Sequence, residues 1–527
     1  MVEFDRRSVV ATLAALSVNA TQPGWAQTPR PTQSELTAPP TVAKFSFEDV
    51  QRRARELASA PLAPISVLPE PLKTLDFEAW RDIRFRPERA LLGASGGPFR
   101  LQTFHLGHLF KQPVTVNTIR DGMATPIPYS ANLFDYGRTK IERPLPVNLG
   151  FAGFRLHYPL NDPRVYDEAI AFLGASYFRF LGRSQRYGLS ARALAVNAGT
   201  EQEEFPFFRE FWIETPEAGS DRATIYALLD GESVSGAYRF DLWPGVDSVL
   251  EVSATLFARR PGVKLGLAPL TSMFFIGEND RRTNSEYRPE VHDSDGLLVN
   301  TRAGEWIWRQ LRNPEKLAVS TFVDKDVRGF GLFQRDRSFE HYQDLDLAYE
   351  RRPSYWVEPI NGWGEGRVEL VELPTTDETN DNIVAMWAPN ETPEPGKAFN
   401  FSYRVTTSLE QARYSPNGRA INTYQTQARS LGAREPVTPF SRRFIIDFAG
   451  GDLAYFLNDL PNVELVPSTA AGTILRSSLM QNAHTKGFRA IIDVQLEAGQ
   501  STDLRAFLRS GNRTLTETWT FPWKAVE

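Results

Sequence analysis

The sequence predicts an all-β protein built from two sandwich domains. Aromatic residues make up 12% of the 527 residues, and the 36 glycines and 37 prolines are spread along the chain rather than clustered. Such a composition favours many short strands joined by turns. Apolar residues also alternate with polar ones at a period of two over much of the chain, as expected for strands with one buried face.

The amino-terminal residues are typical of an export signal. Arg6 and Arg7 precede an uncharged stretch, and Gly24-Trp25-Ala26 places small residues at the two positions that a signal peptidase needs. The paired arginines resemble a twin-arginine signal, and an ordinary secretory signal is the alternative. We predict a signal peptide over residues 1–26, a flexible leader over residues 27–43 and a mature protein outside the cytoplasm.

Two short helices are expected after the leader. Ser46 and Asp49 form a capping box, and apolar residues follow at helical spacing up to Pro61. A second helix is predicted from Asp162-Pro163 to about Leu173, with the aspartate as its cap and the proline in its first turn.

Strands are expected along most of the remaining chain. The alternation is clearest over residues 250–258, 399–405 and 492–496. It lapses in a polar stretch between Thr406 and Arg443, and this lapse predicts a domain boundary.

Three segments follow from that boundary. Residues 44–410 are long enough for a large antiparallel sandwich, and residues 431–527 have the size and strand spacing of an immunoglobulin-like sandwich. We predict a linker region over residues 411–430 between them.

Composition and spacing exclude several classes of function. The net charge of −5 offers no large attraction for nucleic acid or anionic lipid, and the lack of cysteine excludes disulfides and thiolate chemistry. No Walker or dinucleotide-binding loop is present, so no nucleotide cofactor is expected. No two of the six histidines have the spacing of a metalloprotease helix, and Asp293-Ser-Asp295 lacks the EF-hand pattern. We therefore expect no cofactor and no metal site.

Acidic residues gather beside turn formers and aromatic residues in three regions. These are residues 277–282 with 290–296, residues 376–382, and residues 355–366. Glycoside hydrolysis needs one protonated carboxyl group to release the leaving oxygen and one ionised group to activate water. Aromatic faces also stack on sugar rings. The pattern predicts a saccharide cleft, with solvated turns as the alternative, because Asp and Asn are also common turn residues.

Eight longer motifs span nearly the whole predicted large domain. They are FAGFRLHYPLN from Phe151, GASYFR from Gly174, YGLSAR from Tyr187, EEFPFFREFW from Glu203, LTSMFFIGENDRR from Leu270, YRPEVHDSDGL from Tyr287, RRPSYWVEP from Arg351 and TNDNIVAMW from Thr379. In this order they resemble the periplasmic glucan biosynthesis family OpgG/OpgD, also called MdoG/MdoD. The paired arginines are similar to the OpgD branch.

The resemblance implies a fold, a location and a substrate. It implies a mutarotase-like large β-sandwich with a small immunoglobulin-like domain, located in the periplasm. The implied partner is β-1,2-linked glucan, and the implied activity is that of an inverting β-1,2-glucanase or a related transglycosylase. The alternative is a glucan-binding scaffold that holds nascent glucan for an inner-membrane synthase. The sequence has no coiled-coil or other interface signature, so no oligomeric state is predicted.

The same resemblance assigns two catalytic residues. Asp381, in TNDNIV, matches the general acid, and Asp293, the first aspartate of HDSDG, matches the general base. Inverting enzymes separate such carboxyl groups by about 6.5–9.5 Å, and a longer separation requires a relay through water or a sugar hydroxyl. Asp381 must stay protonated near neutral pH, which calls for partial burial or for a nearby acid such as Asp377 or Glu378.

Further residues are predicted to contact the glucan by stacking and by hydrogen bonds to its hydroxyl groups. They are Tyr177, Arg179, Tyr187, Arg192, Trp356, Trp363 and Glu358. For each tryptophan, a place in the core is the alternative. Arg351 and Arg352 are expected to pair with Glu358 or Glu365 and to shape the cleft.

Overall fold

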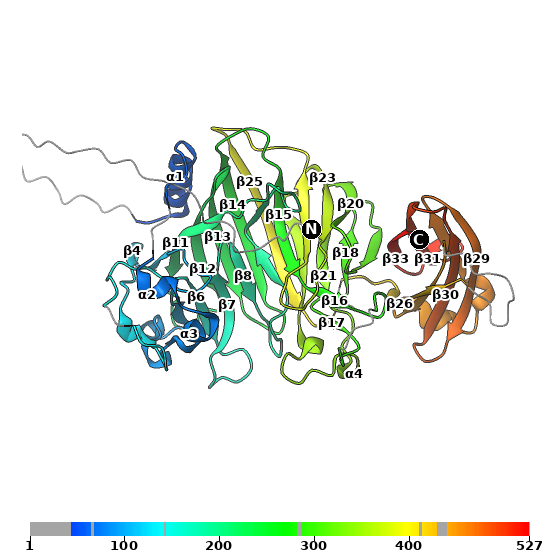
Figure 1. Ribbon diagram of the computed structural model, residues 1–527, viewed down its shortest axis with the longest axis horizontal. Helices are drawn as coiled ribbons and strands as arrows, with labels where there is room; N and C mark the ends of the chain where they lie inside the picture. Colours follow the sequence, from blue (N-terminus) through cyan, green and yellow to red (C-terminus); the bar gives the residue numbers. More distant parts are fainter. Residues whose placement is uncertain are drawn as a thin grey trace, which may run out of the picture. The chain divides into compact units, whose positions relative to one another are not determined.

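The computed structural model describes residues 44–64, 68–141, 144–281, 286–410, 414–428 and 440–525. The predicted signal peptide and leader, residues 1–43, lie outside these ranges. The described chain is mostly strand, as predicted, and most of its strands belong to two large sheets and one smaller sheet (Figure 1). Lys44 to Glu527 form one compact unit.

The first large sheet is antiparallel. In spatial order it contains β2 (Arg100–Phe104), β6 (Gly153–Tyr158), β7 (Asp167–Leu173), β8 (Tyr177–Phe180), β9 (Ser190–Arg192), β15 (Leu265–Ser272), β24 (Ile383–Pro389), β23 (Glu365–Glu372) and β20 (Ala318–Lys325), with β10 (Leu194–Val196) also paired to β15.

The second large sheet runs through residues of both predicted domains. In spatial order it contains β28 (Glu464–Thr469), β31 (Ser501–Ser510), β33 (Thr518–Lys524), β19 (Trp306–Gln310), β18 (Gly296–Asn300), β21 (Gly329–Phe333), β22 (Ser354–Ile360), β25 (Ala398–Ser408), β14 (Val249–Ala258), β13 (Val234–Trp243), β12 (Ala223–Asp230), β11 (Phe207–Glu214), β3 (Thr115–Arg120) and β4 (Met123–Pro126), with β32 (Arg513–Thr514) paired to β31. β33 joins β19 in parallel register, Trp519 opposite Trp308.

Three smaller sheets complete the strands of the described residues. One contains β26 (Arg419–Gln427), β27 (Ser441–Ala449), β30 (Gly487–Gln495) and β29 (Thr473–Asn482), and two pairs join β1 (Arg84–Phe85) to β5 (Phe134–Asp135) and β16 (Phe274–Ile276) to β17 (Val291–His292).

Helices are short and few in the described residues. They are α1 (Phe47–Ala58), α2 (Glu70–Lys73), α3 (Phe77–Asp82) and α4 (Phe339–Tyr342), with 3₁₀ turns η1 (Pro87–Arg89), η2 (Gly93–Ser95), η3 (Ala131–Leu133), η4 (Tyr349–Arg351), η6 (Gly451–Phe456) and η7 (Leu460–Asn462). Within this part of the chain, none has the length and apolar character needed to cross a membrane.

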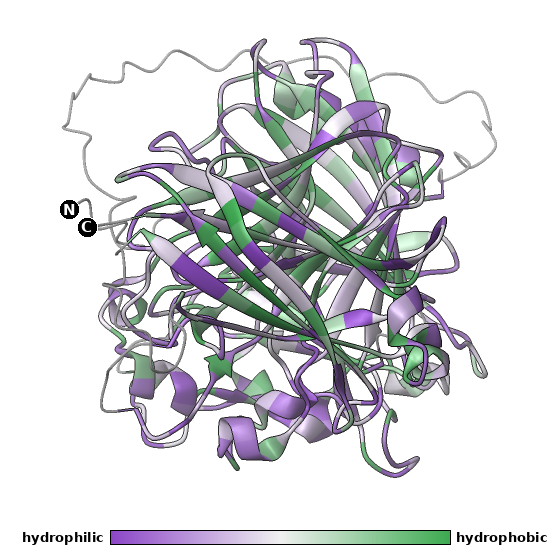
Figure 2. Cartoon of the chain, turned by 90° about the vertical axis from the view of Figure 1, so that its right-hand side faces the viewer, coloured by the Kyte–Doolittle hydropathy of each residue, from purple (hydrophilic) through white to green (hydrophobic). Residues whose placement is uncertain are grey.

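Two hydrophobic clusters account for most of the core. The larger one combines buried residues of both large sheets, among them Phe172, Phe211 and Trp387. The second joins the small sheet to β31 and β33, and it also includes Trp308, Phe333 and Trp356. Figure 2 shows hydrophobic residues alternating with hydrophilic ones along the strands, as the period of two predicts.

The predicted α1 forms with its capping box, in which the Ser46 backbone N–H donates to Asp49 Oδ2 at 2.9 Å. The helix lies against β12, β13 and β14, where Val50 and Ala54 are fully buried (Figure 1). The predicted strands are also present as β14, β25 and β30.

The second predicted helix is wrong. Asp162 accepts hydrogen bonds from the backbone and side chain of Arg164, so the cap signal closes a turn rather than starting a helix. The residues that follow form β7, where Ile170 and Phe172 enter the core between β6 and β8. A strand at this place pairs with the backbone N–H and C=O groups of both β6 and β8, which a helix could not do.

The predicted linker also differs from the structure. β26 (Arg419–Gln427) lies within residues 411–430 and pairs with β27 along its length. Polar residues of this strand, such as Thr423 and Gln425, bind the region around Glu278, and this explains why the segment lacks a regular apolar pattern.

Candidate active site

The two candidate catalytic aspartates lie on loops that are fixed to the same short segment. The backbone N–H of Asp293 donates to the Met273 carbonyl at 2.8 Å. Next to Asp381, the Asn382 side chain accepts from the Phe274 N–H at 2.8 Å and donates to the Phe274 carbonyl at 3.0 Å. Met273 and Phe274 are neighbours in the sequence. The loop of Asp293 and the loop of Asp381, whose aspartates are 88 residues apart, are therefore held side by side just after the end of β15.

The two aspartates differ in their surroundings. Asp293 is 4% exposed and lies between β17 and β18, whereas Asp381 lies two residues before β24 and is half-buried. A buried carboxylate needs a compensating charge, and Arg352 forms an ion pair with Asp293.

Arg352 is central to the charges of this region. Its guanidinium lies 3.8 Å from the centre of the Tyr349 ring. Burial lowers the pKa of Arg352 to about 10, and this fall is opposed by the charges of Glu378 and Asp381 and reinforced by those of Arg179 and Arg288. Arg352 therefore interacts electrostatically with both candidate aspartates.

The expected partners of the two arginines were wrong. Glu358 is exposed and lies opposite Arg404 on β25, and Glu365 lies 3.6 Å from Lys325. Glu358 lies towards the end of β22 that is far from Arg352, and Glu365 is the first residue of β23, whose last residue leads into the loop of Asp381. Arg351 donates to the Ser184 carbonyl at 2.9 Å.

The loop of Asp381 is tied to the loop of Asp293 by a second set of charges. Glu378 Oε2 accepts from Tyr349 Oη at 2.5 Å and from Arg288 Nη1 at 2.8 Å. The same arginine binds Asp344 at 3.0 Å and Glu286 at 2.8 Å. The charge of Glu378 is therefore balanced by Arg288. Asp377, the other acid expected to act on Asp381, instead accepts from the Thr379 N–H within its own turn.

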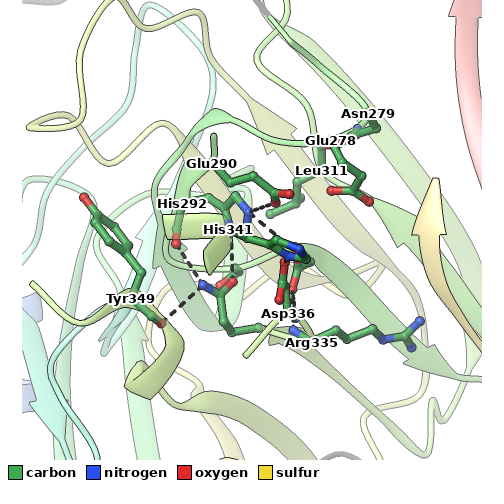
Figure 3. Close-up of polar contacts among 12 residues, drawn as sticks. Glu278, Asn279, Glu290, His292, Leu311, Arg335, Asp336, His341 and Tyr349 are labelled. Atoms are coloured by element: carbon green, nitrogen blue, oxygen red, sulfur yellow. Dashed lines mark hydrogen bonds and ion pairs between the residues drawn. The ribbon is translucent and has the colours of Figure 1, made fainter. Parts of the chain in front are cut away.

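His292, adjacent to Asp293, is fully buried between carboxylates (Figure 3). Gln334 Nε2 donates to the His292 carbonyl at 2.9 Å, which turns its Oε1 towards His292 Nδ1, also at 2.9 Å. Nδ1 must therefore donate. His292 Nε2 lies 3.0 Å from Glu290 and 3.7 Å from Asp295, so it donates as well. The ring is an imidazolium.

The pKa values in this cluster agree with that assignment. Burial lowers the pKa of His292, but the charges of Asp295, Glu290 and Glu278 outweigh it and raise the pKa to about 9. Burial raises the pKa of Glu278 well above its usual value, and the neighbouring Glu290 and Asp295 add to the rise. Ligand atoms of Glu290, His292 and Asp295 lie close enough to surround a cation, yet the protonated ring already supplies the positive charge.

Residues of the predicted linker and of the predicted C-terminal domain reach this region. Arg335 and Asp336 donate their backbone N–H groups to Asp295 Oδ2. The Arg335 guanidinium forms a bidentate pair with the buried Glu517, with Nη2 at 2.8 Å from Oε2. Glu278 accepts from the Thr423 N–H of β26 at 3.1 Å.

Of the predicted contact residues, three lie on β8 and β9, and one of them, Arg179, acts on the charge of Arg352. Arg179 is exposed, donates to Ser190 Oγ at 2.9 Å and acts on the charge of Arg352. Tyr177 lies opposite Arg192 in the register of β8 and β9. Arg192 is 1% exposed, pairs with Glu203 at 2.9 Å and faces the Tyr177 ring.

Tyr187 is half-buried in the loop that precedes β9. Burial raises the pKa of Tyr187 well above its usual value, and the nearby charge of Glu168 adds to this effect. Its phenol therefore stays protonated and can act as a hydrogen-bond donor.

The tryptophans lie elsewhere. Trp356 is 3% exposed, and its ring stacks on Trp306 with a centroid distance of 5.6 Å. It lies four residues beyond Arg352, which corresponds to about 13 Å along a strand. Trp363 is half-buried and donates to the Ser402 carbonyl at 3.1 Å. The structure brings neither indole to the two aspartates, because β22 carries both away from Arg352.

Sequence reasoning missed three residues that hold the two loops together. They are Asn382, Tyr349 and Arg352 as a partner of Asp293. Asn382 directly follows the predicted acid, and Arg352 lies in the RRPSYWVEP motif. Both residues therefore lie in motifs that the sequence comparison had already singled out. Tyr349 carried no local signal.

Comparisons with known proteins give the same family over nearly the whole chain. The family model described as "Periplasmic glucan biosynthesis protein, MdoG" matches residues 45–523. The glucans biosynthesis protein G of Ralstonia nicotianae is 44% identical, covering 90% of this chain and 95% of the relative. The probable glucans biosynthesis protein D of Shewanella oneidensis is 42% identical, covering 92% of this chain and 89% of the relative.

A third relative extends these findings, whereas one solved structure does not. The glucans biosynthesis protein D of Xanthomonas campestris pv. campestris is 43% identical, covering 98% of this chain and 97% of the relative. The solved structure of the Slr1438 protein of Synechocystis sp. PCC 6803 covers 49% of this chain and 93% of its own, at 10% identity and a TM-score of 0.15, too weak a similarity to support an argument.

Proposed function

The chain belongs to the periplasmic glucan biosynthesis protein family MdoG, and from this premise we propose that it cleaves or transfers β-1,2-linked glucan in the periplasm. In this proposal Asp381 is the general acid and Asp293 the general base of an inverting endo-acting enzyme. The observation that carries the proposal is the attachment of both aspartate loops to Met273 and Phe274.

The surroundings of Asp293 support its assigned role, and the position of Asp381 leaves it open to a bound chain. The ion pair with Arg352 favours the ionised form of Asp293, which a base requires. Asp381 is half-buried at the start of β24, where a carboxyl group can reach a bound chain. In a single displacement, Asp381 would protonate the leaving oxygen while Asp293 accepts a proton from the attacking group.

The attacking group decides the product. Water gives a shorter linear glucan, and a sugar hydroxyl gives transglycosylation or ring closure. Arg179, Tyr177 and Tyr187 are proposed to hold the glucan by stacking and hydrogen bonds. The charge of Arg179 acts on Arg352, Tyr177 lies two residues before Arg179 on β8, and Tyr187 adjoins Gly188, where a Cβ would lie 2.9 Å from the Cβ of Arg352. Arg192 is proposed to support Tyr177 from below.

A second candidate is a non-catalytic scaffold that holds glucan for an inner-membrane synthase. One observation favours it: the relatives are named for biosynthesis of glucans rather than for their cleavage. In that case the aspartates would bind sugar hydroxyl groups without transferring protons.

Incubation of the purified protein with linear β-1,2-glucan, followed by separation and mass analysis of the products, distinguishes these candidates. Chain shortening or a ring, which weighs one water less than the linear chain, is the expected result. Unchanged polymer with retained binding would favour the scaffold.

Three variants then test the residue roles. Asp381→Asn and Asp293→Asn should each lower kcat by at least about 100-fold, the usual contribution of general acid–base catalysis. Asp377→Asn, in the same turn as Asp381 but bonded within that turn, is the matched control and should keep most of the activity. Full activity in Asp381→Asn would refute the acid assignment.

A further inference from the structure

Arg352 lies between the loops of the two candidate aspartates. It pairs directly with Asp293, and its guanidinium lies on the ring of Tyr349, whose hydroxyl donates to Glu378 in the loop of Asp381. We propose that Arg352 is a counter-ion shared by the two carboxyl groups, stabilising whichever one is negative during turnover. This inference rests on the proposed function.

The need for a shared counter-ion follows from the proton balance of an inverting step. Before the step Asp293 is ionised and Asp381 is protonated. The Asp381 proton then goes to the glycosidic oxygen as its bond to the anomeric carbon breaks, and the attacking oxygen bonds that carbon while its proton goes to Asp293. Afterwards Asp381 is ionised and Asp293 is protonated. One negative charge is present throughout, but it has moved from one loop to the other.

Moving a charge within a partly buried site is costly unless a compensating charge serves both positions. Neighbouring cations are already engaged. Arg288 binds Glu286, Asp344 and Glu378, and the Nε of exposed Arg179 donates to Ser190 Oγ. Arg352 is 8% exposed, and its Nε is buried with no hydrogen-bond partner among the described residues. It therefore has a donor to spare beyond its pair with Asp293.

The position of Arg352 is fixed from several sides. Its backbone N–H donates to the Tyr349 carbonyl at 3.1 Å, and its carbonyl accepts from Arg337 at 2.8 Å. The guanidinium lies on the Tyr349 ring. A side chain at Gly188 would place its Cβ 2.9 Å from the Cβ of Arg352, so glycine leaves the space that Arg352 occupies. Arg352 can thus stay in place while the charge moves.

The groups that set the electrostatics around Arg352 come from separate elements. They are Asp293 after β17, Glu378 and Asp381 before β24, Arg179 on β8, Arg288 before β17 and Tyr349 on η4. Removal of the Arg352 charge leaves Asp293 and Asp381 with less positive charge nearby. Both carboxyl groups should then lose protons at higher pH.

The test compares Arg352→Gln and Arg352→Lys with the wild type through the pH dependence of kcat/KM on β-1,2-glucan. In Arg352→Gln both limbs of the bell-shaped profile should move up by about one pH unit or more, and the maximum should fall at least about 10-fold. Arg352→Lys keeps the charge and should restore the limbs to within about half a unit of the wild type. Arg351→Gln, whose side chain binds a carbonyl, is the neighbouring control and should leave the profile in place.

A purely structural role would lower the rate without moving either limb, and that result overturns the proposal. A second measurement covers variants that fold poorly and separates this inference from the proposed function. Carbon NMR of protein labelled at aspartate carboxyl groups, assigned with Asp293→Asn and Asp381→Asn, follows both titrations without substrate. Equal midpoints for both groups in Arg352→Lys and Arg352→Gln refute a shared counter-ion, even if the wild type leaves glucan unchanged. Raised midpoints in Arg352→Gln beside an inactive wild type refute only the proposed activity.

Discussion

The residues next to Asp293 are held by charges in addition to the packing of His292 against the Phe274 and Tyr342 rings. His292 carries a positive charge with no exposure to solvent, and Glu290, Asp295 and Glu278 surround it. Burial of so many ionisable groups is costly, and it is tolerated only where each group has a partner. The backbone of Asp293 is therefore kept in place by a network whose strength depends on pH.

The folded protein should lose stability as the pH rises through about 9. The pKa of His292 is about 9 in the folded state and 6.5 in an ordinary histidine, so its contribution is complete below pH 6.5 and disappears above 9. Glu278 acts in the same direction, because its raised pKa makes ionisation costly in the folded state. The loss from His292 is about 3 kcal/mol at most.

Urea unfolding of the wild type and His292→Gln between pH 6 and 10 measures this effect. The fall in the free energy of unfolding should be smaller in His292→Gln. The exposed His484→Gln is the control and should follow the wild type. Parallel curves for wild type and His292→Gln would contradict the imidazolium assignment.

Trp356 should prove to be a core residue rather than a sugar platform. Trp356→Ala removes a large side chain from the second hydrophobic cluster and should lower the free energy of unfolding by about 3–5 kcal/mol. Tyr455→Ala, at a position 84% exposed, should change it by less than about 0.5 kcal/mol. Denaturant unfolding measures both. Wild-type stability with lost glucan binding in Trp356→Ala would restore the stacking role.

Helices and strands were predicted correctly where the pattern that determines them lies within one short segment of the sequence. The alternation in β14 and β25 and the capping box of α1 lie within single segments, so they were found. β7 was missed because Asp162-Pro163 resembles a helix start, and only pairing with β6 and β8 decides otherwise.

In the candidate site, too, features set by a local pattern were predicted, and features set by contacts between distant segments were not. Both acid-rich loops were visible in the sequence, since acids beside turn formers form a local pattern. The partner of Arg352 was not visible, because it depends on which loop meets the start of β22. The tryptophans were misplaced for a related reason: the direction of β22 takes Trp356 into a core that the sequence does not reveal.

We expect Asn382 to position Asp381, because its side chain links the start of β24 to two other segments. Its side chain makes three hydrogen bonds of 2.8–3.0 Å, to Phe274 N, Phe274 O and Leu373 O. Asn382→Ala would leave buried backbone groups unpaired and should cost about 2 kcal/mol of stability. It should also lower kcat more than it raises KM, because Asp381 would lose its position.

Asn380→Ala, in the same turn but exposed, is the control for that measurement. Kinetics on β-1,2-glucan and urea unfolding on both variants separate the two effects. A destabilised Asn382→Ala with unchanged kcat would show that Asp381 is positioned by other contacts.

At the scale of the whole molecule, the second large sheet joins the two predicted domains. β33 pairs with β19, and the Arg335–Glu517 ion pair links Asp295 to the C-terminal strands. The C-terminal residues therefore support the loop of the candidate base. A two-domain prediction from a lapse in periodicity could not detect this, because β26 and β33 use polar side chains at the junction.

We expect one cooperative unfolding transition over the described chain. Glu517→Gln removes the negative charge from the ion pair with the buried side chain of Arg335, so it should cost about 3–5 kcal/mol and lower the temperature of the whole transition. Arg505→Gln removes an exposed partner of Glu305 and should cost less than about 1 kcal/mol. Calorimetry measures both. Two separate transitions in the wild type would show that the C-terminal strands fold independently.

The parallel pairing of β33 with β19 also sets an order of events during synthesis. Trp308 and Thr520 are 212 positions apart, yet the Trp308 carbonyl accepts from the Thr520 hydroxyl at 3.2 Å. A ribosome adding about 5–20 residues per second needs at least about ten seconds to make the intervening chain. During that time the edge of β19 is open to other strands, so the nascent protein should depend on chaperones until its last strands emerge.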